Sequence, residues 1–142
     1  MRLFLAVALS LVAGAAMAQQ NTKQFPFWPW VKAGSYSPPN AVHMTMWLNM
    51  ETVRRVDDGV MEGWIKYAND RADESGAMET LVYERLDCHR NWHASISLMK
   101  YDRAGKVVFA GKAKPEDMEP IIPNSLLAGM MPFTCAAGGM PQ

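Results

Sequence analysis

The sequence predicts an α+β fold that is mainly β, with an antiparallel sheet followed by one short C-terminal helix. Three observations support this prediction. From Ala41 onwards apolar and polar residues alternate, which is the pattern of strands with one buried face. Turn-forming residues interrupt these runs at short intervals. Beyond Pro115 the apolar spacing changes to that of a helix, so the sheet is expected to come first.

Residues 1–18 have the pattern of a cleavable secretory signal peptide. Arg2 precedes an apolar run that is too short to span a bilayer, and small residues stand at Ala16 and Ala18, the positions that signal peptidase requires. We therefore expect cleavage between Ala18 and Gln19 and export to the periplasm or the medium. Because Gln19 stands where a lipoprotein carries cysteine, and no second long apolar run follows, the sequence predicts neither a lipid anchor nor a membrane span.

The composition of the chain excludes some classes of partner. The whole chain of 142 residues contains 14 Lys and Arg and 14 Asp and Glu, and only Arg2 among them leaves with the signal peptide. Such a balance gives no long-range attraction to nucleic acid or to anionic lipid. We expect one small domain that does not bind nucleic acid.

Two cysteines, Cys88 and Cys135, lie in the exported part of the chain. An oxidising compartment favours a disulfide between them, the alternative being two unpaired buried thiols. In the chain-entropy model such a disulfide stabilises the fold by roughly 4 kcal/mol. It would therefore supply a large share of the stability of a small domain.

Residues 19–40 form an N-terminal arm that is rich in proline and aromatic residues. Prolines at this density disfavour helices and central strands, whereas the aromatic side chains favour burial. We expect the arm to pack against the domain at residues 41–136, the alternative being a recognition segment. The tail at residues 137–142 is expected to be flexible.

The predicted strands follow the arm in order. In the first, Val42, Met44, Met46, Leu48 and Met50 share the buried face, which leaves Trp47 on the other. In the fourth, His89, His93 and Ser95 share one face, while Cys88, Trp92, Ala94, Ile96 and Leu98 share the other. Asp58–Gly59 is predicted to turn into the second strand, and the segment 101–106 to close a hairpin between the fourth strand and residues 107–110. The predicted strands cover residues 42–50, 60–68, 78–86, 88–101 and 107–110.

The helix is predicted to begin at Asn124 or Ser125, since either side chain can cap its first turn. The next apolar residues fall on one helical face, and they are Leu126, Leu127, Met130 and Met131. Pro132 is predicted to stop or kink the helix, which places Cys135 at or just past its end. The disulfide would then join a strand to this helical segment.

No motif in the sequence predicts catalysis or cofactor binding. A phosphate-binding glycine loop, a nucleophile elbow and a Cys-x-x-Cys pair are all absent from the chain. His89 and His93 could share a zinc ion on a helix, but on a strand they would lie about 13 Å apart. We therefore expect no catalytic residue, no metal ligand from this pair, and no cofactor.

Methionine suggests one alternative function. His43, Met44, Met46 and Met50 resemble the soft ligands that bind copper(I) in exported proteins. The competing interpretation is that the thioethers fill the core, because these methionines share the strand face of Val42 and Leu48. Strand periodicity favours the core interpretation.

The order of several short motifs resembles the surface-adhesin protein E family of Gram-negative bacteria. The motifs are Met46-Trp47-Leu48, Glu84-Arg85-Leu86-Asp87-Cys88, Tyr101-Asp102 with Gly105, and Ile121 to Ser125 followed by Cys135. The resemblance covers roughly residues 25–135. It implies a sheet of about six antiparallel strands with a disulfide-clasped helix, a non-enzymatic role in binding host plasma or matrix proteins, and the ability to pair as a homodimer.

Together these features predict an exported, non-catalytic module that binds a host or envelope macromolecule. Trp47 is the candidate contact residue, since it lies on the face opposite the methionines, although the aromatic arm could equally cover it. The alternative is a periplasmic metal-handling or envelope accessory protein that uses His43 and the methionine stripe.

Overall fold

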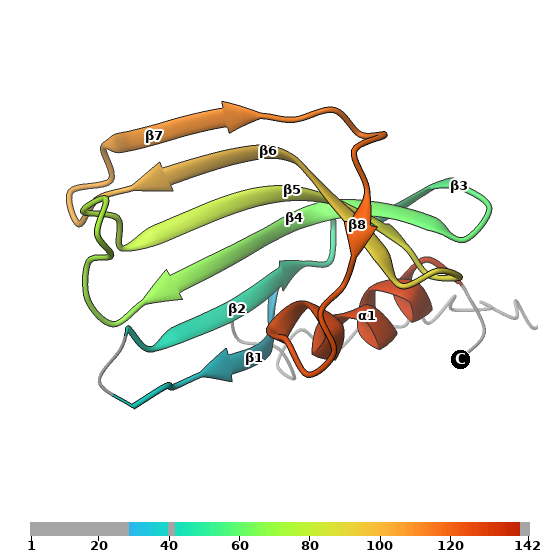
Figure 1. The fold of residues 1–142 in the computed structure, drawn as a ribbon, viewed down its shortest axis with the longest axis horizontal. Helices are drawn as coiled ribbons and strands as arrows, with labels where there is room; N and C mark the ends of the chain where they lie inside the picture. Colours follow the sequence, from blue (N-terminus) through green and yellow to red (C-terminus); the bar gives the residue numbers. More distant parts are fainter. Residues whose placement is uncertain (1–28, 40–41, 140–142) are drawn as a thin grey trace, which may run out of the picture.

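The computed structural model describes residues 29–39 and 42–139. Its elements are β1 (Trp30–Tyr36), β2 (Met44–Asn49), β3 (Arg54–Asp57), β4 (Val60–Asn69), β5 (Glu79–Asp87), β6 (Trp92–Tyr101), β7 (Val107–Lys112), β8 (Glu119–Pro120) and α1 (Leu126–Ala137). Six strands form an antiparallel sheet in the order β1-β2-β4-β5-β6-β7, while β3 pairs with β4 and β8 with β6. The predicted mainly β fold with one C-terminal helix is confirmed (Figure 1).

The hydrophobic core lies between α1 and one face of the sheet, which we call the helix face. Met46 and Leu48 of β2 pair with Tyr67 and Ile65 of β4, so these side chains share that face. They pack with the buried residues of α1, which include Leu127, Met130 and Met131. In Figure 1, α1 covers only one end of the sheet and leaves the end near the β6–β7 hairpin free. We call the opposite face of the sheet the outer face.

The strand β1 was not predicted, because it lies in the segment assigned to the arm at residues 19–40. Its residues contain no proline, although Pro29 and Pro38 flank them, so the strand can pair with β2 along its length. Gly34 lets α1 approach closely, since a Cβ atom there would lie 3.1 Å from Leu126 Cδ2. The first part of the arm lies outside the described residues.

Both predicted turns are present, and the first also closes a hairpin with β3, a strand that was not predicted. Gly59, with φ of 68°, closes β3 onto β4, and Gly105, with φ of 77°, closes β6 onto β7. In the second turn the Asp102 side chain accepts hydrogen bonds from the backbone N–H groups of Ala104 and Lys106, both at 2.9 Å. The sequence predicted this hairpin from its turn-forming aspartate and from a glycine that can adopt positive φ.

The predicted fourth strand, residues 88–101, is wrong at its start. Residues 88–91 form a turn, because the buried carboxylate of Asp87 accepts the backbone N–H groups of His89 at 3.0 Å and Arg90 at 2.9 Å. His89 therefore does not lie on one strand with His93. The strand β6 begins at Trp92.

The faces predicted for β6 also need correction beyond Ser95. Glu84 pairs with Ser95 whereas Tyr83 pairs with Ser97, so the register shifts at Ile96. This bulge puts Leu98 on the helix face with His93 and Ser95, and puts Ser97 on the outer face. An alternation read from sequence cannot show such a shift.

The helix begins as predicted, with Ser125 Oγ accepting the Ala128 N–H at 3.1 Å. The prediction that Pro132 stops the helix is wrong, because α1 continues to Ala137 and includes Cys135. Pro132 is exposed on α1, while Met130, Met131 and Thr134 around it are buried. Burial of these neighbours and the disulfide to Cys88 offset the hydrogen bond that proline removes.

Candidate binding surfaces

The outer face carries aromatic and basic side chains around Trp47. Trp47 pairs with Lys32 of β1 and with Lys66 of β4, so both ammonium groups share its face. Lys66 Nζ lies 4.9 Å from the ring centroid of Trp30, and the Trp64 and Tyr83 rings are 5.1 Å apart. We call these residues the aromatic patch. Aromatic and basic groups of this kind are enriched in protein interfaces.

A buried carboxylate anchors the neighbouring part of the outer face. Glu62, with 5 % of its side chain exposed, accepts hydrogen bonds from Arg54 at 2.9 Å, Arg85 at 2.6 Å and the Tyr83 hydroxyl at 3.0 Å. Burial alone would raise the pKa of Glu62, but the hydrogen bonds from Arg85, Arg54 and Tyr83 outweigh burial and lower it. Two guanidinium groups for one carboxylate leave this network with net positive charge. It therefore suits contact with an acidic surface.

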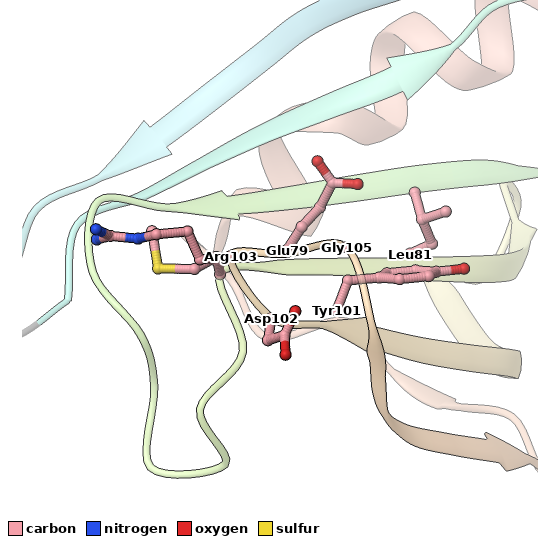
Figure 2. A pocket seen from close by; sticks show the side chains of 7 residues that line it. Glu79, Leu81, Tyr101, Asp102, Arg103 and Gly105 are labelled. Carbon is pink, nitrogen blue, oxygen red and sulfur yellow. The ribbon is translucent and has the colours of Figure 1, made fainter.

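At the end of the outer face near the β6–β7 hairpin there is an open pocket of about 430 Å³. Its lining residues come from the end of the loop before β5, from β5 and β6, and from the hairpin turn, and they are Met78, Glu79, Leu81, Tyr101, Asp102, Arg103 and Gly105. Figure 2 shows the Arg103 side chain pointing away from those of Leu81 and Tyr101. The floor of the pocket is thus apolar and its rim is charged. The pocket continues the outer face.

The strand β7 forms one edge of the sheet and is exposed. The exposed fractions of Val107, Val108 and Phe109 are 47 %, 40 % and 51 %. Along the main path of the described sheet β7 pairs with β6 alone, so its other side is an open edge. An apolar open edge is a template for the addition of another strand.

The helix face also contains a pocket, of about 400 Å³, where α1 leaves the sheet uncovered. Glu84 lies in it with 4 % of its side chain exposed. Its carboxylate accepts a hydrogen bond from Ser95 Oγ at 2.6 Å and lies 3.3 Å from His93 Nδ1. The hydrogen bond between His93 and Glu84 raises the pKa of His93, whereas burial alone would lower it.

The cluster of Glu84, His93 and Ser95 lacks the order of a nucleophilic triad. In such a triad the imidazole accepts the proton of the nucleophile, and the carboxylate orients the imidazole. Here Ser95 donates to the carboxylate instead, and His93 Nε2 lies 3.5 Å from Glu119 Oε1. The geometry therefore suits binding rather than activation of the serine hydroxyl.

The structure places the residues singled out in the sequence as follows. Cys88 and Cys135 form the predicted disulfide, which joins the turn after β5 to α1 with Cα atoms 6.0 Å apart. Trp47 lies on the face opposite the methionines, as predicted, and is half-buried. The residues of the predicted cleavage site, Ala18 and Gln19, lie outside the described part of the chain.

The methionine stripe lies in the core. Met46 is 0 % exposed and packs in the main cluster, Met50 packs against that cluster, and Met44 is half-buried. His43 is exposed, and its backbone N–H donates to Asp70 at 3.0 Å. Core packing therefore accounts for the position of Met46 and Met50 without a metal ion.

Sequence reasoning missed Glu62, Glu84 and the open edge at β7. A carboxylate at the centre of a predicted strand is one available signal, because Glu and Asp are almost never buried unless paired. The arginines that pair with Glu62 come from β3 and β5, and the partners of Glu84 come from β6. These pairings depend on strand register, which the sequence alone does not specify.

Comparison with known proteins identifies the family. The family model described as surface-adhesin protein E matches residues 30–136, which is most of the chain and covers β1 through Ala136 of α1. No curated protein and no solved structure matches the chain significantly. Among the described residues no helix is long and apolar enough to cross a bilayer. The match over residues 30–136, together with the disulfide-clasped helix on an antiparallel sheet, shows that this chain belongs to the surface-adhesin protein E family.

Proposed function

We propose that the protein is an exported, non-catalytic module that binds a host or envelope protein through its outer face. The observation that carries this proposal is the aromatic patch, which lies on the face that α1 does not cover. Membership of an adhesin family supports a binding role. The partner surface should be acidic with apolar contacts, because Lys32 and Lys66 flank Trp47. In addition, two arginines surround the single carboxylate of Glu62.

Export would follow from the signal peptide at residues 1–18, with cleavage between Ala18 and Gln19. The proposed destination is the periplasm or the medium. Mass spectrometry of the exported protein should give an N-terminus at Gln19 without a lipid. An N-terminus at Met1 or an acylated N-terminus would contradict this part of the proposal.

Self-association would use the open edge at β7. Two copies can pair their β7 strands antiparallel, which satisfies the free backbone groups and covers Val107, Val108 and Phe109. A Val108→Lys substitution should reduce the dimer fraction in sedimentation experiments without lowering the midpoint of thermal unfolding. A monomeric wild-type protein, or a variant that associates as strongly, would exclude this edge as the dimer interface.

Capture of partners by the purified oxidised protein tests the main proposal. Plasma proteins, matrix proteins and envelope extract are passed over wild type, Trp47→Ala and Phe133→Ala. Phe133 is the matched control, because it is an exposed aromatic residue on α1 rather than on the outer face. We expect the control to retain the partner and Trp47→Ala to lose it while keeping its fold. Equal capture by both variants would remove Trp47 from the interface.

A further inference from the structure

The pocket on the helix face has the size and lining of a small-ligand site. Its volume of about 400 Å³ falls within the usual range of ligand pockets. Apolar side chains from β2, β5, β6 and α1 form its walls, and they are Met44, Val82, Leu98 and Leu127. Four separate elements therefore converge on one hollow.

The charge at one end of this pocket is negative. Glu84 is as buried as Glu62, with 4 % and 5 % of the two side chains exposed. Two arginines bind Glu62, whereas the described residues provide Glu84 with only Ser95 and His93. A buried carboxylate without a permanent cation is costly. The site therefore favours a ligand that brings positive charge.

The other charged groups around the pocket strengthen this preference. His93 lies between two carboxylates, with Glu84 at 3.3 Å and Glu119 at 3.5 Å. Lys100 is the permanent cation in the pocket lining, and its ammonium is 2.9 Å from Asp73. In the pocket lining the two carboxylates, Asp73 and Glu84, thus face one permanent cation, Lys100, which Asp73 already binds. A bound cation would compensate Glu84 when His93 is neutral.

The rest of the lining specifies the shape of the ligand. From Glu84, β5 runs past Val82 to Thr80, a distance of about 13 Å at roughly 3.3 Å per residue. Val82 and Leu98 line the middle, and the ring of Tyr67 also borders the pocket. At the far end, Asn69 Oδ1 is buried without a hydrogen-bond partner among the described residues. Along its length the pocket thus offers a carboxylate at one end, an apolar wall in the middle and a free hydrogen-bond acceptor at the other end.

We propose that this pocket binds an aliphatic ammonium group on a short apolar stem, with the ammonium at Glu84 and the stem along Val82 and Leu98. A carboxylate accepts up to about four hydrogen bonds, so Glu84 can accept ammonium N–H groups in addition to Ser95 and His93. The ring of Tyr67 adds a face for a cation–π contact. A free alkylamine and the lysine side chain of another protein share this chemistry.

Titration of the folded protein with matched probes tests the proposal. Pentylamine, 1-pentanol and pentanoate have the same stem and differ in the charge of the polar end. We expect pentylamine to bind at least about tenfold more tightly than the other two. We also expect Glu84→Gln to abolish this preference and Glu62→Gln, the equally buried control on the outer face, to retain it.

A measurement on wild type covers the case in which Glu84→Gln fails to fold. Pentylamine should cause saturable NMR shifts at the amides of Val82, Ser95 and Leu98. Its affinity should fall as the pH drops below the raised pKa of His93, because protonated His93 then compensates Glu84. Equal affinity for the three probes, or no saturable shift with pentylamine, would overturn the proposal.

Two further experiments identify the source of the ammonium group and test whether binding is confined to the helix face. Tighter binding of a blocked lysine peptide than of pentylamine would assign the pocket to a lysine of another protein, and the reverse would assign it to a free amine. Trp47→Ala, on the outer face, should bind pentylamine like wild type. Failure of the pocket proposal would therefore leave the outer-face proposal untouched.

Discussion

Two buried carboxylates, Glu62 and Glu84, lie on opposite faces of the sheet and have different surroundings. Glu62 is bound by Arg54, Arg85 and the Tyr83 hydroxyl, so the network satisfies its charge internally. Glu84 has Ser95 and His93, which leaves its charge only partly compensated. The first arrangement stabilises the outer face, whereas the second prepares a site for a cation.

Replacement of Glu62 by Gln should destabilise the protein by about 1–2 kcal/mol, because charge-assisted hydrogen bonds to two arginines are lost. The loss is limited because Arg54 and Arg85 are 64 % and 30 % exposed and can be solvated. Urea unfolding measures the change. Glu116→Gln in an exposed loop is the control and should have no measurable effect, and equal stability of the two variants would contradict the role of the network.

Acid should destabilise the protein partly through Asp73. Hydrogen bonds from Ser75 and Lys100 lower the pKa of Asp73. A carboxyl group with a lowered folded-state pKa stabilises the fold above its unfolded pKa of about 4, and this stability is lost as the pH falls towards the folded value. The urea midpoint should therefore drop between pH 5 and pH 3, as a rough window. In Asp73→Asn this drop should be smaller, and an unchanged pH dependence would contradict the assignment.

At the scale of elements, α1 depends on tertiary contacts for its position. It contains Pro132, and its described first and last turns have no charged residues that would favour a helix on its own. Burial of Met130 and Met131 and the Cys88–Cys135 disulfide hold it on the sheet. Packing and the covalent link thus outweigh the local sequence signal at Pro132.

Removal of the disulfide by Cys88→Ser with Cys135→Ser should destabilise the protein by about 4 kcal/mol. The helix would separate from the sheet first, because its C-terminal turn loses its covalent link. Hydrogen exchange should then be faster in α1 than in β4 and β5. Uniform exchange across the sheet and the helix would show that α1 is held without the disulfide.

At the scale of the whole molecule, the sequence predicted the elements whose signals are local. The alternation around Met46 and Leu48 predicted β2, and Asp102 with Gly105 predicted the β6–β7 hairpin. The strand β1 was missed because the prolines that flank it obscured its pairing, and β8 has only two residues. The bulge at Ile96 and the pocket at Glu84 depend on register between strands, which no local pattern encodes.

The functional residues also divide into those with a local signal in the sequence and those that depend on strand register. Trp47 could be placed on its face from alternation alone, and the register with Lys32 and Lys66 confirms that placement. The charged side chains around Trp47 come from four strands, so only the folded sheet brings them together. The outer face and the helix face emerge as two separate surfaces that sequence reasoning could not distinguish.

Binding of a purified captured partner to Trp47→Ala and Glu84→Gln in parallel tests the central claim, that the outer face recognises the partner. We expect Trp47→Ala to weaken the affinity at least about tenfold, as at an aromatic contact residue, and Glu84→Gln to leave it unchanged. Both variants must first show wild-type circular dichroism. Unchanged affinity of Trp47→Ala together with loss of binding by Glu84→Gln would contradict the claim and assign the partner to the helix face.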